Sequence, residues 1–172
     1  RTKSFNAFSS IDYPETAIFR DHRLIQFLQR PAEYTHAVFS TALDPNVFVL
    51  RLVPGMRADI IPMLEGRYRA LVLESFGVGG LPGGDDGAMF AAVRDWCGAG
   101  HLAVFTTQVP HEGSDLAVYE VGRAAKALPG VLEAHDMTPE ATAVKLMWVL
   151  GQTTDRAEAE KLFLTPVQWD IL

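Results

Sequence analysis

The 172-residue sequence has little of what several functional classes require. It has one cysteine, Cys97, so no internal disulfide can form, and a reducing compartment fits this composition. Basic side chains are fewer than acidic ones, 15 Lys and Arg against 21 Asp and Glu, and the net charge of −6 argues against direct nucleic-acid binding. No uncharged apolar run approaches the roughly 18 residues of a membrane-spanning helix, so we expect no membrane partner.

The start of the sequence lacks an initiator methionine and the apolar segment of a signal peptide. We therefore expect a chain that is a fragment or a processed piece. The composition is that of an ordinary globular protein, with 48 % hydrophobic and 21 % charged residues, and the length fits one domain with a short appendage. We interpret residues 1–16, which are mostly polar, as a lead-in or linker, and residues 17–172 as the domain.

Apolar periodicity predicts a hairpin over residues 17–29, and then strands that alternate with helices. The expected strands cover residues 47–53, 70–74 and 102–105, and the helices that follow them cover residues 58–65, about 85–99 and 115–128. Two more helices end the chain. Thr138 with Pro139 predicts the start of the first, and Asp155 with Glu158 resembles a capping box for the second.

This order of elements predicts an α/β fold of three layers, α/β/α, with a small, mostly parallel sheet of the Rossmann or flavodoxin kind. The carboxyl ends of parallel strands lie at one edge of the sheet, where ligands of such sheets bind. Two loops should meet there, the glycine-rich SFGVGGLPGG (residues 75–84) and the polar TTQVPHEGS (residues 106–114). We expect any function of the domain to lie in these two loops.

Glycines dominate the first loop and allow the backbone close approaches. They are Gly77, Gly79, Gly80, Gly83, Gly84 and Gly87. One interpretation is a phosphate cradle at the start of the following helix. The spacing matches neither G-x-G-x-x-G nor a P-loop, however, and Asp85 and Asp86 would repel an anion. A tight structural or amide-binding turn is therefore favoured.

The second loop offers polar side chains that could in principle form a Ser/His/Asp set. They are Thr106, Thr107, Gln108, His111, Glu112, Ser114 and Asp115. Their spacing fixes no geometry, so a polar surface loop is the favoured interpretation.

Other candidates for chemistry are weaker. The five histidines, His22, His36, His101, His111 and His135, show no metal-ligand spacing, so we expect no zinc site. Cys97 is predicted to be a buried small hydrophobe, and Leu146, Met147 and Trp148 are predicted to belong to the core. Lys145 is predicted to snorkel at a helix flank rather than to act in catalysis.

Three segments, ALVLESFGVGGLP, TTQVPHEGSDLAVYEVG and DMTPEATAVKLMWVLGQT, resemble in this order the C-terminal domain of the cytoplasmic-type bacterial and archaeal L-asparaginases. They are also similar to the asparaginase-like subunit of the archaeal glutamyl-tRNA amidotransferase. The opening KSFNAFSSIDYP resembles the segment that precedes the linker between that family's two domains. The resemblance covers nearly the whole chain and implies that residues 1–16 are an interdomain linker.

The resemblance also implies an activity and partners. The parent protein is expected to hydrolyse L-asparagine to L-aspartate and ammonia with a threonine nucleophile and no metal or organic cofactor. That threonine lies in a T-G-G-T-type turn of the family's N-terminal domain, which this sequence lacks, so the isolated chain is expected to be inactive. The implied partners are an N-terminal asparaginase domain and further copies in a homodimer or homotetramer, and the implied location is the cytoplasm.

Site residues follow from the same resemblance, because the family's active site forms between one subunit's N-terminal domain and a neighbour's C-terminal domain. The matching contribution here is Tyr119 of the V-Y-E-V-G motif, and a half-buried helix aromatic is the alternative interpretation of that residue. The candidate edge-loop residues are Gly77, Gly79, Gly80, Thr107 and Gln108.

The sequence departs from the family at three positions. Some relatives have an allosteric asparagine site with an arginine and a cysteine where this chain has Glu74 and Val109, which puts that regulation in doubt. Many relatives have an asparagine where this chain has Gly80.

Two alternatives to the asparaginase interpretation stay open: a non-catalytic module that binds a small ligand or partner at the glycine-rich edge, and a subunit of a tRNA-dependent amidotransferase.

Overall fold

The structure is a computed structural model that describes residues 14–28, 38–82, 87–109, 111–167 and 170–171. The chain divides into two units, Arg1–Ser40 and Thr41–Leu172, and each is described by itself. Most of the predicted linker, residues 1–16, lies outside the described residues. In the described ranges, no helix has the length and apolar character that crossing a membrane would need.

The first unit contains the predicted hairpin. Strands β1 (Ala17–Arg20) and β2 (Arg23–Gln26) pair antiparallel. Asp21 and His22 join the strands with φ angles of 49° and 61°. A two-residue loop with positive φ at both positions is a type I′ turn, whose twist matches that of the flanking strands. The hairpin prediction is therefore confirmed.

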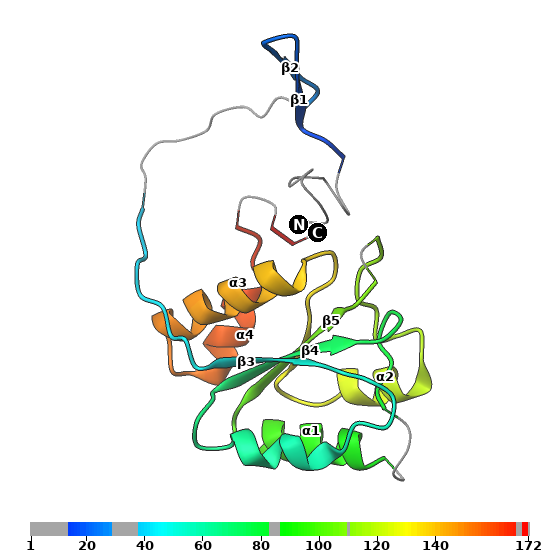
Figure 1. Ribbon diagram of the computed structural model, residues 1–172. Coiled ribbons are helices and arrows are strands. Elements are labelled where there is room, and N and C mark those ends of the chain that lie inside the picture. The colour runs from blue at the N-terminus through cyan, green and yellow to red at the C-terminus, as the bar shows by residue number, and fades with distance from the viewer. Residues whose placement is uncertain (1–13, 29–37, 83–86, 110, 168–169, 172) are drawn as a thin grey trace. The chain divides into compact units, whose positions relative to one another are not determined.

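The second unit is built on a parallel sheet with the strand order β3-β4-β5-β6 (Figure 1). Its strands are β3 (Val47–Arg51), β4 (Ala70–Ser75), β5 (Leu102–Thr107) and β6 (Val131–Glu133). Every residue of β5 is buried, and every residue of β4 except Glu74. Continuous burial of this kind is typical of parallel strands that are covered on both faces.

Helical segments cover the two faces of this sheet (Figure 1). Strand order follows chain order, so right-handed crossovers place every connection on the same face. The connections are the 3₁₀ turns η1 (Ala58–Ile60) and η2 (Pro62–Leu64), then α1 (Ala88–Gly98) and α2 (Glu120–Lys126). The last two helices, α3 (Pro139–Gln152) and α4 (Arg156–Leu164), cover the opposite face. The predicted three-layer α/β/α fold is confirmed.

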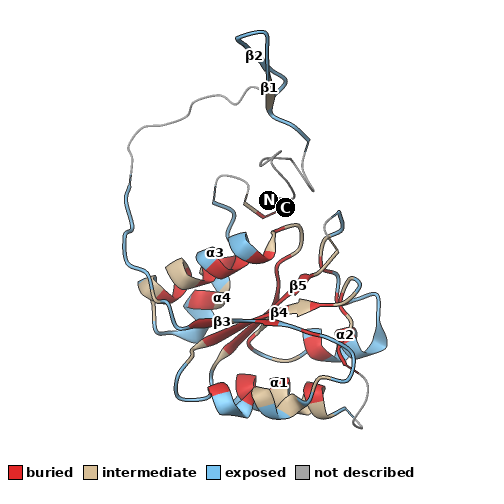
Figure 2. Cartoon of the chain, in the orientation of Figure 1, coloured by how far each residue is buried: buried red, intermediate tan, exposed pale blue. Residues whose placement is uncertain are grey.

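The sheet separates two hydrophobic cores, and buried residues lie on both sides of it (Figure 2). Side chains alternate between the faces along each strand, so Val72 and Val104 pack under α3 and α4 while Leu73 packs toward the crossovers. Cys97 belongs to the crossover-side core and is 2 % exposed, which confirms that it is a buried thiol. Burial raises the pKa of this thiol to about 11.

Local start signals in the sequence are confirmed by side-chain caps. The hydroxyl of Thr138 accepts a hydrogen bond from the amide of Ala141 at 3.2 Å, and α3 begins at Pro139. The carboxylate of Asp155 accepts from the amide of Glu158 at 2.8 Å, and α4 follows it. The reciprocal half of the expected capping box differs, because the amide of Asp155 donates to the hydroxyl of Thr153 at 3.0 Å. Both caps satisfy amides that have no partner inside the helix.

Several expected elements are corrected by the structure. Strand β6 was not predicted, because its three residues are too few to show a period. The helix predicted for residues 58–65 is two 3₁₀ turns, since Pro62 lacks the amide hydrogen that an α-helix would use there. The helix predicted from Asp85 begins, among the described residues, at Ala88 after Gly87, whose φ is 81°; Asp85 itself lies outside the described residues.

The prediction for Lys145 is wrong. Its side chain is 5 % exposed rather than snorkelling, and its ammonium lies 2.9 Å from a carboxylate oxygen of Asp170. It also donates a hydrogen bond to the carbonyl of Thr165 at 3.0 Å. A buried charge is tolerated when it is paired and hydrogen-bonded, so Lys145 holds the C-terminal residues against α3.

Candidate functional site

The two loops predicted to meet at the carboxyl edge of the sheet do so. The hydroxyl of Thr107, at the end of β5, donates to the carbonyl of Gly77 at 2.5 Å. Further along, the amide of Asp115 donates to the carbonyl of Val78 at 2.7 Å. These two bonds fix the glycine-rich loop after β4 against the polar loop after β5.

The glycines of the first loop allow close packing. A Cβ at Gly80 would lie 2.7 Å from the carbonyl oxygen of Phe76 and 2.8 Å from its ring, so an asparagine at this position would displace Phe76. A Cβ at Gly79 would lie 3.1 Å from the carbonyl of Asp115. The described part of the loop is a tight turn, as favoured from the sequence; Gly83, Gly84, Asp85 and Asp86 lie outside the described residues.

Tyr119 lies beside this turn. Its hydroxyl is 3.3 Å from the place where a Cβ at Gly77 would stand, and Gly77 has a φ of 59°, so a larger residue would be both strained and obstructed there. The tyrosine is 47 % exposed. A hollow of about 370 Å³ opens next to it, lined by Phe76, Gly77, Gly80, Leu81, Tyr119 and Val121.

The backbone that carries Tyr119 differs from the prediction. A helix was expected over residues 115–128, but α2 begins only at Glu120, and Tyr119 is its extended N-cap residue. The carboxylate of Asp115 accepts from the amide of Ala117 at 2.8 Å, which is a local turn that competes with a helix. The interpretation of Tyr119 as a residue within a helix is therefore wrong.

The polar residues of the second loop mostly bind backbone. The side-chain amide of Gln108 donates to the carbonyls of Leu52 and Glu74, at 2.6 and 2.8 Å, and so joins the ends of two strands. Thr106 is fully buried, and its hydroxyl lies 3.4 Å from the carbonyl of Met137. These residues shape the edge and expose little reactive surface.

The Ser/His/Asp arrangement considered from the sequence is not formed by the described residues. Ser114 is 3 % exposed, and its hydroxyl has no hydrogen-bond partner among the described residues. Its amide donates to the carbonyl of His135 at 2.8 Å, which places the serine by its backbone. The favoured interpretation as a polar surface loop holds for His111, Glu112 and Asp115, which are exposed, but not for Thr106, Thr107 and Ser114, which are buried.

Sequence reasoning missed an ion pair behind this edge, in which the carboxylate is buried and the lysine is half exposed. Glu133, at the end of β6, is 5 % exposed and accepts a hydrogen bond from the amide of Leu116 at 2.9 Å. Its other carboxylate oxygen lies 2.5 Å from the ammonium of Lys126, and this hydrogen bond raises the pKa of Lys126. A glutamate that ends the short apolar run V-L-E was the signal in the sequence.

The contacts of Glu74 bear on whether an anionic effector can bind at this position. Its side chain is 13 % exposed and pairs with Arg51 at 3.5 Å, and the two residues are register partners on β4 and β3. The carboxylate thus faces a guanidinium of its own chain. An anionic ligand at this place would have to displace that partner and approach Glu74 itself.

Metal ligands do not gather in the described part of the chain, where no group of three or more His, Cys, Asp or Glu side chains is placed to hold an ion. The ring of His101 stacks on Trp96 with centroids 4.2 Å apart. His36 lies outside the described residues.

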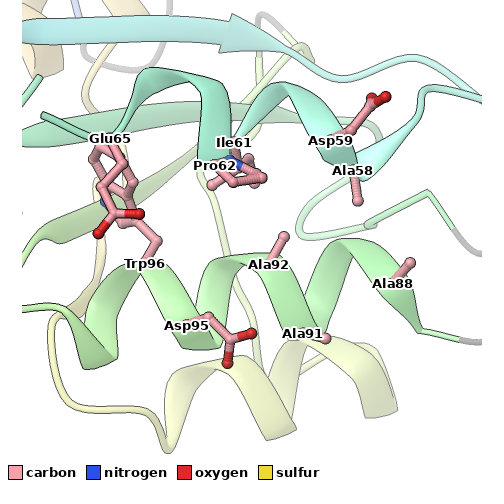
Figure 3. Close-up of a pocket in the computed structure, with 10 residues that line it drawn as sticks. All are labelled: Ala58, Asp59, Ile61, Pro62, Glu65, Ala88, Ala91, Ala92, Asp95 and Trp96. Carbon is pink, nitrogen blue, oxygen red and sulfur yellow. The ribbon is translucent and has the colours of Figure 1, made fainter. Parts of the chain in front are cut away.

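A second hollow, of about 350 Å³, lies between the 3₁₀ turns and α1 (Figure 3). Its walls are four alanine side chains with Ile61, Pro62 and Trp96, and three carboxylates. Two of its carboxylates, Asp59 and Asp95, pair with neighbouring arginines at 2.8 Å. Because Asp59 and Asp95 are already paired and no Ser, Thr, Cys, His or Lys lines this hollow, the carboxyl edge beside Tyr119 stays the candidate site.

Comparison with known proteins identifies relatives over nearly the whole chain. The family model of the glutaminase/asparaginase C-terminal domain matches residues 46–163. An L-asparaginase of Thermococcus kodakarensis is 39 % identical over 158 residues, which make up 91 % of this chain and 47 % of that protein. A subunit of the glutamyl-tRNA(Gln) amidotransferase of Metallosphaera sedula is 32 % identical over 170 residues, 95 % of this chain and 37 % of that protein.

Solved structures agree. The thermostable L-asparaginase from Thermococcus kodakarensis superposes with a TM-score of 0.89 at 34 % identity, over 100 % of this chain and 52 % of that one. L-asparaginase I from Vibrio cholerae gives 0.79 at 21 % identity, over 96 % and 50 %, which is a likeness of fold. The chain spans about half the length, or less, of the relatives it matches.

Proposed function

This chain belongs to the glutaminase/asparaginase C-terminal domain family, and on that premise we propose that it is the C-terminal part of an L-asparaginase. The parent protein would hydrolyse L-asparagine to L-aspartate and ammonia. The observation that carries the proposal for this domain is the place of Tyr119. Its phenol lies against Gly77 at the carboxyl edge of the sheet, next to the hollow of about 370 Å³.

In the proposed reaction, a threonine hydroxyl of the N-terminal domain attacks the side-chain amide carbon of asparagine. The new C–O bond forms, the C–N bond breaks, and the nitrogen leaves as ammonia after taking up a proton. Water then cleaves the acyl-enzyme ester, which releases aspartate and restores the threonine. No step of this sequence calls for a metal or an organic cofactor.

The role proposed for Tyr119 is to complete that site from a neighbouring subunit. A phenol can donate a hydrogen bond to an oxygen that gains negative charge as the amide becomes tetrahedral, and such a bond is stronger in a closed site than in water. Tyr119 is 47 % exposed, so a neighbouring subunit can cover it. Gly77, Gly79, Gly80, Thr107 and Gln108 would form the edge on which it rests. Because the site needs a neighbouring subunit, the proposal includes a homodimer or homotetramer. It also includes a location in the cytoplasm, which the resemblance to cytoplasmic-type asparaginases implies.

A second candidate is a subunit of a tRNA-dependent amidotransferase, and the similarity to the Metallosphaera sedula amidotransferase subunit over 95 % of this chain favours it. The two candidates differ in what the parent does with free amino acids. An asparaginase releases ammonia from free asparagine, whereas the amidotransferase subunit would require its tRNA-bound substrate. A non-catalytic binding module would release ammonia under neither condition.

The test uses the full-length parent protein and measures ammonia release from L-asparagine and L-glutamine. Tyr119→Phe removes one hydroxyl and keeps the ring, so kcat/KM should fall by roughly 10- to 1000-fold. The free energy of unfolding should change by less than about 1.5 kcal/mol, because a single hydrogen bond is lost. Tyr68→Phe is a matched control, since Tyr68 packs edge-on against Phe48 with ring centroids 5.1 Å apart.

The outcomes test the role of Tyr119 and separate the candidate functions. Parental kcat/KM in Tyr119→Phe would remove Tyr119 from the site, and unfolding of that variant would support a packing role instead. A parent that releases no ammonia from free asparagine would overturn the asparaginase proposal. Ammonia release that depends on charged tRNA would favour the amidotransferase.

A further inference from the structure

The segment that carries Tyr119 has no regular structure of its own. Residues 115–119 precede α2; the amides of Ala117 and Val118 bond back to Asp115, whereas the first two amides of the segment bond to other parts of the molecule. The amide of Asp115 donates to Val78 at 2.7 Å, and the amide of Leu116 donates to the carboxylate of Glu133 at 2.9 Å. The position of Tyr119 therefore depends on anchors outside its segment.

Glu133 is the unusual anchor, because a carboxylate that is 5 % exposed is costly unless its charge is matched. One oxygen accepts from the Leu116 amide, and the other contacts the ammonium of Lys126 at 2.5 Å. Leu116 itself is fully buried in the crossover-side core. Both carboxylate oxygens thus have a charge-assisted partner, which makes these bonds stronger than those between neutral groups.

The two partners of Glu133 bracket Tyr119 in the chain. Leu116 precedes the tyrosine by three residues, and Lys126 is the last residue of α2, which begins directly after it. In addition, a Cβ at Gly122 would lie 2.4 Å from the carbonyl oxygen of Leu116, so the helix already packs tightly on the segment. A slide or rotation of this piece would change how Tyr119 lies over Gly77.

We propose that Glu133, with Lys126, is a positioning residue that fixes the segment of residues 115–126 and thereby holds the Tyr119 phenol in place for the reaction. This inference rests on the proposed function of Tyr119. Glu133 acts through the backbone and touches no substrate. Its partner Lys126 keeps a 52 % exposed side chain, so the pair can be altered at Lys126 without opening the core.

The kinetic test is a double-mutant cycle in the full-length parent. Glu133→Gln keeps an oxygen for the Leu116 amide but removes the charge that attracts Lys126. We expect kcat/KM to fall about 10-fold, mainly through kcat, within the roughly 100-fold that a misplaced group costs. In the Tyr119→Phe background the same change should cost less than about 2-fold, since the cycle removes effects that pass through Tyr119.

Two lysine variants supply a second test and its control. Lys126→Met removes the ammonium that pairs with Glu133, and the change lies at an exposed position. It should reproduce the kinetic effect of Glu133→Gln to a smaller degree. Lys161→Met makes the same change on α4, where the lysine pairs with Glu158 at 3.7 Å and is 73 % exposed. That variant should keep the parental kcat/KM.

Hydrogen exchange gives a readout that is independent of activity. In Glu133→Gln the amides of residues 115–122 should exchange about 10-fold faster, because a charge-assisted bond is replaced by a weaker neutral one. Amides of α4 should be unchanged in the same protein. Lys126→Met should show faster exchange in the same segment, and Lys161→Met should not.

The results separate failure of the inference from failure of the proposed function. An equal loss of kcat/KM from Glu133→Gln in both backgrounds, or unchanged exchange in residues 115–122, would overturn the positioning role. If Tyr119→Phe has the parental kcat/KM, the role proposed for Tyr119 is what fails, and a parent that releases no ammonia from asparagine means that the proposed function fails. In either case faster exchange would still support the anchoring of the segment by Glu133, and unchanged exchange would overturn it.

Discussion

Gly122 lies where α2 packs on the segment before it, and the change in stability on Gly122→Ala can be calculated from that contact. In an ordinary helix interior, Gly→Ala stabilises by about 1 kcal/mol. At position 122 the added Cβ would lie 2.4 Å from the carbonyl oxygen of Leu116, against at least 3.4 Å in ordinary contact. The obstacle is backbone, and the Leu116 amide is held by Glu133, so the strain cannot relax through a side-chain rotation. Overpacking of this kind costs about 1–3 kcal/mol, and the upper end applies here.

The net expectation for Gly122→Ala is a loss of about 2 kcal/mol in the free energy of unfolding, the difference between a strain of about 3 and a helix gain of about 1. Thermal or urea unfolding measures it, and Tm should fall by about 4–8 °C for a chain of this size. Gly98→Ala is the matched control. Gly98 also lies in a helix, α1, and a Cβ there would meet no atom within 4 Å. That variant should be unchanged or stabilised by up to about 1 kcal/mol.

A Gly122→Ala protein that is as stable as the Gly98→Ala protein would refute the reasoning, because helix propensity alone would then decide both results. In the full-length parent, Gly122→Ala should also lower kcat/KM, since relief of the strain requires the segment that carries Tyr119 to move. Loss of stability with an unchanged kcat/KM would mean that the strain relaxes away from Tyr119.

Three further predictions concern the chain itself. Burial raises the pKa of Cys97 from 9.0 to about 11, so in that range the unfolded thiol loses its proton first and the free energy of unfolding falls as pH rises. Urea titrations at about pH 8 and about pH 11 should show a fall that is larger than in Cys97→Ala by up to about 2–3 kcal/mol, and equal falls would contradict the shift. The isolated chain should fold but release no ammonia from L-asparagine; release above a no-protein blank that a substitution within the chain abolishes would disprove this. Asparagine should not bind the isolated chain as an effector, because Glu74 already occupies the guanidinium of Arg51; saturable heat in calorimetry that Glu74→Ala removes would be the contrary result.

Features set by neighbouring residues were predictable from the sequence. The start of α3 follows from Thr138 and Pro139, because an N-cap and a proline at the first helical position are contacts between adjacent residues. The layer order also follows from local periodicity, since each strand of the sheet is a run of apolar residues long enough to recognise. The exception is β6, whose three residues include the buried Glu133.

Features set by distant residues were not predictable in this way. Residues 115–119 have a helical pattern, but the Leu116 amide bonds to a carboxylate 17 residues away and α2 starts later. Lys145 has the pattern of a flank residue, but Asp170 and Thr165 reach it from beyond α4. For the site, the meeting of the two edge loops was predictable from parallel topology, and the role of Tyr119 stays a prediction.

The order of the strands has a consequence for how the chain is made. Each strand pairs with the one synthesised just before it, so the sheet can grow in step with synthesis and needs no late insertion between finished strands. All three connections cover the same face as they appear. The opposite face gains its cover from α3 and α4, the last helices to be made. A nascent chain that has emerged from the ribosome only as far as Thr138 would therefore present a paired but half-bare sheet, with Val72 and Val104 open to solvent, which is a form that chaperones bind.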